Sequence, residues 1–245
     1  MAPVIEAGLW GLVAGASLVV GAVLGLARPV PQRVIAIVMA FGAGVLISAL
    51  SFELADEAFD RGGTDALALG LVGGALTFWA GDWIIDRRGG DHRKRSGGQQ
   101  AGGSAPAIVL GAVLDGIPES VAIGVSLVGG SAVSAAVVGA VFLSNVPEAL
   151  SAAVGLRKAG HSSRWILGLW AGVALISAVA AALGYAMLGG ASGNVIGVFQ
   201  AFAAGAILTM LADTMIPEAY EDGGPAVGVV TVLGFALAYL LSQAG

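Results

Sequence analysis

The segments "FGAGVLISALSFELADEAFDRGG" (residues 41–63) and "FAAGAILTMLADTMIPEAYEDGG" (residues 202–224) are two versions of one apolar pattern. Aligned without gaps, they share Phe, Ala, Gly and Leu at four positions of the apolar part. They also share Glu-Ala and Gly-Gly at the acidic end. A similar composition of the two segments does not account well for these shared residues. The pair predicts that the chain contains a repeated structural unit.

Composition indicates the setting of this repeat. The 245 residues are 57% hydrophobic and 11% charged, with a mean hydropathy of +0.91. A soluble domain carries roughly twice that charged fraction. Apolar runs of the length that crosses a bilayer as helix recur throughout. We therefore predict an all-α polytopic membrane protein, with a single transmembrane domain over residues 1–245 and eight spans at 5–27, 34–59, 64–85, 105–128, 132–156, 165–188, 195–220 and 226–241.

Basic residues predict the orientation of the eight spans. The loops after spans 1, 3 and 5 hold every Lys and Arg except Arg61, and these loops share one side. Positive loops face the cytoplasm, so we expect a plasma (inner) membrane protein with both termini outside. Residues 86–104, basic and then Gly/Ser/Gln-rich, predict a flexible cytoplasmic loop.

This topology gives the repeated segments opposite directions. Spans 1–3 and 6–8 would then form an inverted repeat, related by an axis in the membrane plane, around spans 4 and 5. Such a layout is typical of transporters with a site near the bilayer midplane. Two further motifs, "GLVAG" (residues 11–15) and "GLWAG" (residues 168–172), predict close helix packing through small residues.

The central spans carry polar residues at membrane depth. Asp115, in "DGIPES", lies about ten residues into span 4, which is ~15 Å along a helix. A carboxylate there costs at least ~2.5–3.5 kcal/mol unless it is compensated. No Lys or Arg lies within the core of any span, so we expect no ion pair to compensate it. The carboxylate could then be compensated by a bound cation, by protonation or by water.

Span 5 repeats this arrangement with "SNVPEA" (residues 144–149). Each motif places polar side chains four residues apart, so they project from one helix face. Pro118 and Pro147 each free a carbonyl oxygen four residues earlier. Oxygen ligands of this kind suit a hard or borderline divalent cation. The motifs predict a metal site formed by Asp115, Glu119, Ser144, Asn145 and Glu148.

The chain resembles the ZIP (Zrt/Irt-like) divalent metal transporters. The features that carry the resemblance are eight spans, both termini outside, a loop after span 3 and the paired x-x-x-Pro-Glu-small motifs. The resemblance covers essentially the whole chain. It implies transport of a divalent metal into the cytoplasm, with zinc as the family substrate. In the family, the first two positions of each motif and its glutamate bind the metal. The resemblance therefore adds Gly116 to the five predicted ligand positions.

The chain departs from the family pattern at several positions. Asp115 and Gly116 stand where the family has histidine and asparagine, and span 6 offers Ser177 where a Glu-Pro is usual. A carboxylate in place of imidazole shifts preference toward Mn, Fe(II) or Mg. We expect the metal as the transported substrate and no prosthetic cofactor.

Outlying acids suggest a path on either side of the site. Glu53 and Glu57 lie toward the outer end of span 2, and Asp213 and Glu218 toward the inner end of span 7. With Ser177, they would line an entrance and an exit. For Glu57 and Glu218 an equally good interpretation is that acids sit at solvated helix ends.

Other functions find less support in the sequence. A proton-coupled exporter of a small organic solute is the alternative, because buried acids also relay protons. We expect no enzyme: a membrane metalloprotease needs a motif such as His-Glu-x-x-His, and the only histidines, His92 and His161, lie in loops. The expected partners are the metal ion and the lipid bilayer, without nucleic acid, and a homodimer is left open.

Overall fold

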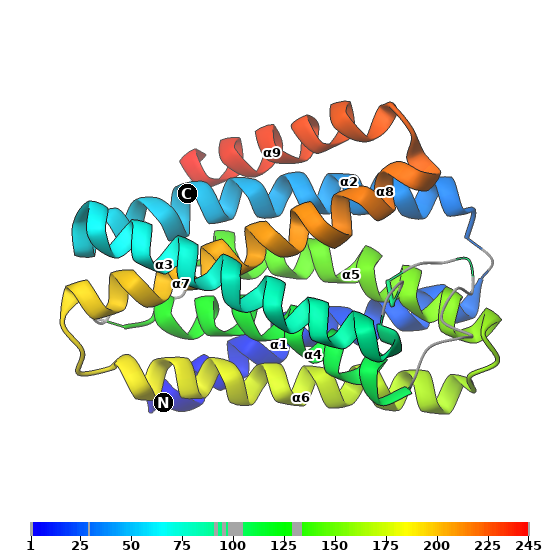
Figure 1. Cartoon of the computed structure of the whole chain (residues 1–245), viewed down its shortest axis with the longest axis horizontal. Helices are drawn as coiled ribbons and strands as arrows, with labels where there is room; N and C mark the ends of the chain where they lie inside the picture. Colours follow the sequence, from blue (N-terminus) through cyan, green and yellow to red (C-terminus); the bar gives the residue numbers. More distant parts are fainter. Residues whose placement is uncertain are drawn as a thin grey trace.

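The computed structural model describes residues 2–28, 30–90, 93–94, 97, 105–128 and 134–244. Every element in these ranges is helical, and the helices lie side by side along one long axis (Figure 1). The elements are α1 (Pro3–Ala27), α2 (Gln32–Ala49), η1 (Leu50–Ala55), α3 (Asp56–Ile85), η2 (Asp86–Gly90), α4 (Ala105–Ser126), α5 (Ala135–Lys158), α6 (Ser163–Leu188), α7 (Gly193–Met210), η4 (Leu211–Met215), α8 (Ile216–Gly223) and α9 (Ala226–Ala244), where η marks a π-helical segment.

Seven helical stretches in the described ranges are long and apolar enough to cross a membrane. This confirms the predicted all-helical class and the apolar helices. The longest stretch, Gln32–Gly90, has 59 residues. Its backbone leaves the helical conformation at Gly63, with φ 68° and ψ −168°, and the chain turns back there (Figure 1). A positive φ is accessible to glycine at little cost, which explains the residue at this turn.

The two segments with similar sequences also have similar local structure. α2 and α7 each have 18 residues and each continue into a π-helical segment, η1 and η4 respectively. Each segment reaches a glycine with positive φ, Gly63 in the first and Gly224 (φ 62°, ψ −151°) in the second. In Figure 1, α2 and α7 run in opposite directions.

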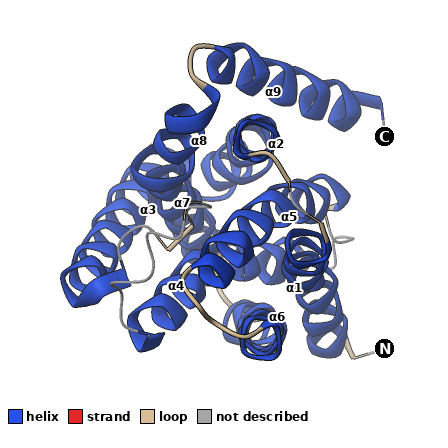
Figure 2. Ribbon diagram, turned by 90° about the vertical axis from the view of Figure 1, so that its right-hand side faces the viewer, coloured by secondary structure: helices blue, strands red, loops and turns tan. Residues whose placement is uncertain are grey.

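Helix packing places α4 and α5 inside the bundle and α9 at its edge (Figure 2). α3 packs against α7, α2 against α9, α1 against α5 and α6, and α4 against α6. Buried apolar side chains such as Met39, Phe78 and Met210 fill the space around α2, α3 and α7. A second cluster, which includes Leu156 and Trp170, joins α1, α5 and α6.

One of the two small-residue motifs forms the expected seam. A Cβ on Gly11 would lie 2.6 Å from the Ala181 Cβ, and one on Gly15 would lie 2.8 Å from the Ala174 Cα. These contacts show that α1 and α6 approach closely through glycine. The prediction for "GLWAG" is wrong, because Gly168 and Gly172 lie on the open side of α6, with no neighbour within 4 Å in the part described.

Candidate cation site on α4 and α5

The polar motifs of α4 and α5 face the interior of the bundle. Pro118 and Pro147 lie inside their helices, which continue through them. Asp115, Glu119 and Glu148 are all buried, with 2–4% of their surface exposed. Acids are almost never buried to this degree without partners. The fold therefore gathers the three predicted carboxylates away from the surface.

Asp115 is paired with an arginine from the segment between η2 and α4. Arg93 donates from Nε to Oδ2 and from Nη2 to Oδ1 of Asp115, both at 3.0 Å. The same guanidinium donates to Asp82 Oδ1 at 2.6 Å and to Asp86 Oδ1 at 3.4 Å. Bidentate charged hydrogen bonds of this kind are among the strongest in proteins. Arg93 thus ties the end of α3 to the middle of α4.

Lys94 bridges the carboxylates of the two central helices. Its Nζ lies 3.3 Å from Asp115 Oδ2 and 3.2 Å from Glu148 Oε1. These are ion pairs whose angles do not meet hydrogen-bond geometry. Burial lowers the pKa of Lys94, but Asp115 and Glu148 outweigh this effect, so the pKa lies above its ordinary value. The ammonium group therefore keeps its charge at neutral pH.

The expectation that no ion pair compensates Asp115 is wrong. The predicted spans do lack basic residues, but the side chains of Arg93 and Lys94 reach the buried carboxylates. The attraction between the opposite charges offsets the cost of burying them. The structure describes part of the predicted loop over residues 86–104. Residues 86–90 continue α3 as η2, and Arg93 and Lys94 are buried. Residues 91–92, 95–96 and 98–104 lie outside the described residues.

The other predicted ligands differ in their contacts. Glu119 Oε1 has no hydrogen-bond partner in the described part of the chain. Ser144 donates to Val141 of its own helix at 3.0 Å, and Asn145 donates to the Ala14 carbonyl of α1 at 3.4 Å. The described residues contain no group of three or more acidic or histidine side chains arranged to hold a metal. Lys94 stands between Asp115 and Glu148, where such an ion would have to bind.

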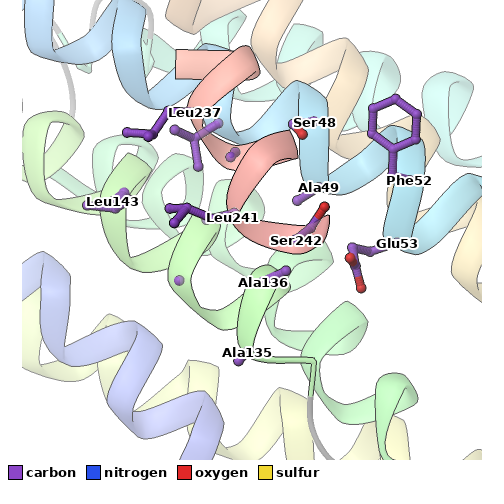
Figure 3. A pocket seen from close by; sticks show the side chains of 14 residues that line it. Ser48, Ala49, Phe52, Glu53, Ala135, Ala136, Leu143, Leu237, Leu241 and Ser242 are labelled. Atoms are coloured by element: carbon purple, nitrogen blue, oxygen red, sulfur yellow. The ribbon is translucent and has the colours of Figure 1, made fainter. Parts of the chain in front are cut away.

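The predicted entrance acids lie near the opposite end of the bundle from Arg93. Glu57 accepts hydrogen bonds from Arg61 Nε at 3.0 Å and from Gln200 Nε2 at 2.7 Å, which links this end of α3 to α7. Glu53 accepts one from Ser134 at 2.8 Å. It lies at a cavity of about 370 Å³ between α2, α5 and α9 (Figure 3).

The remaining predicted residues lie in three different surroundings. Ser177 is buried on α6, where a Cβ on Gly116 would lie 3.6 Å from its Oγ. Asp213 is exposed on η4, outside the buried cluster. Glu218 lies close enough to Lys94 to help raise the pKa of that lysine.

Sequence reasoning missed Arg93, Lys94, Asp82 and Gly111. A Cβ on Gly111 would lie 2.3 Å from Arg93 Cδ, so this glycine leaves room for the arginine side chain. A count of charges could have indicated them. Three acids lie deep within apolar spans that contain no Lys or Arg, so a compensating positive charge has to come from outside the spans. Nothing in "DHRKR" itself distinguishes Arg93 and Lys94 from their neighbours.

Comparison with protein-family models gives no match, and comparison with curated proteins gives none either.

Proposed function

We propose that the chain is an integral protein of the plasma (inner) membrane that transports divalent metal cations through the site on α4 and α5. The observation that carries this proposal is the burial of Asp115, Glu119 and Glu148 on two adjacent helices inside the bundle. Ionisable side chains inside a membrane bundle characteristically mark ion pathways.

The distribution of polar and apolar residues supports the membrane setting. On α9, Val229, Val232 and Leu240 are each about 65% exposed, while the acids of α4 and α5 are buried. Soluble proteins rarely expose large continuous apolar surfaces. Counting the stretch that turns at Gly63 as two crossings gives eight spans. The positive-inside rule then gives outside termini and a cytoplasmic segment after α3.

The matching local structures support the inverted repeat. An inverted repeat that relates spans 1–3 to spans 6–8 maps α2 onto α7 and α3 onto α9. It therefore exchanges the α2–α9 contact with the α3–α7 contact, and both contacts are present. The π-helical segments η1 and η4 occupy equivalent places in this scheme, as do Gly63 and Gly224.

The chemistry of the site supports a divalent cargo bound by oxygen. The buried ligand candidates are carboxylates, a hydroxyl and an amide, and the chain has no cysteine. Oxygen ligands favour Mg, Mn or Fe(II), whereas zinc is the cargo implied by the resemblance. Movement into the cytoplasm follows the same resemblance.

Uptake by proteoliposomes tests this function. With external Mn²⁺, Zn²⁺ or Mg²⁺, we expect uptake by the Glu148→Gln and Glu119→Gln variants to be about tenfold or more slower than uptake by the wild-type protein. The reason is that each variant loses a charged ligand. Asp65→Asn, at an exposed acid of α3, is the matched control and should transport normally. Unchanged uptake in both glutamate variants would rule out the assigned site.

The cavity beside Glu53 favours a second candidate, a proton-coupled exporter of a small organic solute. Its volume of about 370 Å³ is within the range of small-molecule sites, and its lining is largely apolar, as is typical of such sites. Direct binding measurements separate the two functions. Purified protein that binds no divalent metal but binds protons on solute release would favour the exporter.

A further inference from the structure

Arg93 and Lys94 are buried to an unusual extent for residues between two helices. They lie between η2, which ends at Gly90, and α4, which begins at Ala105. Their exposed fractions are 4% and 2%. Lys and Arg are almost never fully buried unless they are paired. The two residues therefore have a specific location in the site.

The surroundings of the pair are fitted to it. Gly111, one helical turn before Asp115, leaves the space that the Arg93 side chain fills. Lys94 contacts one carboxylate on α4 and one on α5. The open space beside the two basic side chains and these acids is only about 10 Å³. That volume is close to the minimum for one water molecule, so no ligated cation fits while both side chains are in place.

Charge balance indicates what replaces them. Arg93 and Lys94 together bring two positive charges to Asp115 and Glu148, and Arg93 also pairs with Asp82. If both withdrew, the site would lose two positive charges, and one divalent cation would restore the original balance. A monovalent cation would restore only one of the two lost positive charges, which is costly for buried acids at membrane depth. Glu119, with an oxygen that has no hydrogen-bond partner among the described residues, offers a further ligand.

We propose that Arg93 and Lys94 are tethered counter-ions that hold the carboxylate site when cargo is absent and are exchanged together for one divalent cation. This inference rests on the proposed transport function and adds a selection step to it. Cargo binds only by displacing two linked charges, so the exchange discriminates against monovalent ions.

The two lysines of the chain allow a direct test in the unmodified protein. Lys94 is buried, and Lys158, at the end of α5, is exposed. Purified protein is pulsed with an acetyl N-hydroxysuccinimide ester, and acetylation of each lysine is measured by mass spectrometry. Mn²⁺, Zn²⁺ and Mg²⁺ are compared with K⁺ at equal ionic strength, and bound metal is measured in parallel by equilibrium dialysis.

Without divalent cation we expect Lys94 to react about tenfold or more slowly than Lys158, because its amine must first open to solvent. A divalent cation that binds should raise the Lys94 rate several-fold and leave Lys158 unchanged, while K⁺ should do neither. The inference is overturned if Lys94 reacts as fast as Lys158 from the start, or stays protected while metal binds. Failure of any divalent metal to bind in dialysis would instead overturn the proposed function, and the exchange with it.

Discussion

Arg93 and Asp115, 22 residues apart in sequence, are joined by two hydrogen bonds of 3.0 Å inside the bundle. The bond pair fixes the orientation of the Asp115 carboxylate and leaves Lys94 to bridge that acid to Glu148. Four buried charges therefore depend on one another. Removing any one of them should leave its partners poorly compensated.

A double-mutant cycle measures this dependence. Asp115→Asn removes the shared partner of Arg93 and Lys94 and should destabilise the protein by about 3–5 kcal/mol. Adding Arg93→Gln should recover part of that loss, with a coupling energy of about 0.5–3 kcal/mol. Unfolding by SDS, followed through the fluorescence of the five tryptophans, gives the free energies. Additive effects would show that the two residues are not coupled.

Gly111→Ala disturbs the arginine without changing any charge. Its Cβ would lie 2.3 Å from Arg93 Cδ and 2.5 Å from Nε, so the guanidinium must leave its place. We expect lower stability and faster acetylation of Lys94. Gly168→Ala, on an open helix face, should instead gain up to about 1 kcal/mol from helix propensity. The same gain in Gly111→Ala would contradict the assigned position of Arg93.

Adjacent glycines on α3 test the packing against α7. A Cβ on Gly74 would lie 2.0 Å from the Phe202 carbonyl oxygen, whereas one on Gly73 would make an ordinary contact 3.7 Å from Phe202 Cδ2. Gly74→Ala should lower the free energy of unfolding by about 1–3 kcal/mol, as overpacking does. Gly73→Ala should have little effect. Equal unfolding midpoints for the two variants would contradict the close approach of α3 and α7.

Single cysteines test the eight-span topology, because the native chain contains none. Thr64→Cys lies beside the turn at Gly63, and Ser162→Cys lies just before α6; both positions are exposed. A membrane-impermeant maleimide added to intact cells should label Thr64→Cys alone. Opening the cells should make Ser162→Cys reactive as well. Labelling of Ser162→Cys in intact cells would place the positive loops outside.

Much of the architecture could be predicted because a bilayer limits a chain of this composition to apolar helices. The boundaries predicted for the apolar segments lie close to the ends of the helices, since both follow the same apolar runs. The burial of Asp115, Glu119 and Glu148 was also predictable, because each lies deep within such a run.

The positions of Arg93 and Lys94 could not be predicted in the same way. Periodicity describes residues within a helix, whereas these two lie between η2 and α4 and reach their partners through long side chains. Nor does spacing reveal that Ser144 bonds to its own helix and Asn145 to α1. Such choices depend on which acceptors lie nearby once the helices have packed.

The dissociation constant of Mn²⁺, measured by equilibrium dialysis alongside Zn²⁺ and Mg²⁺, tests the exchange of tethered charges most directly. The double variant Arg93→Gln/Lys94→Gln should bind the transported ion at least about tenfold more tightly than wild type, because no internal cation then competes. The matched control, Lys158→Gln/Arg164→Gln, removes two exposed charges of the same sign and should bind as wild type does. Equal or weaker binding by the Arg93/Lys94 variant would contradict the account.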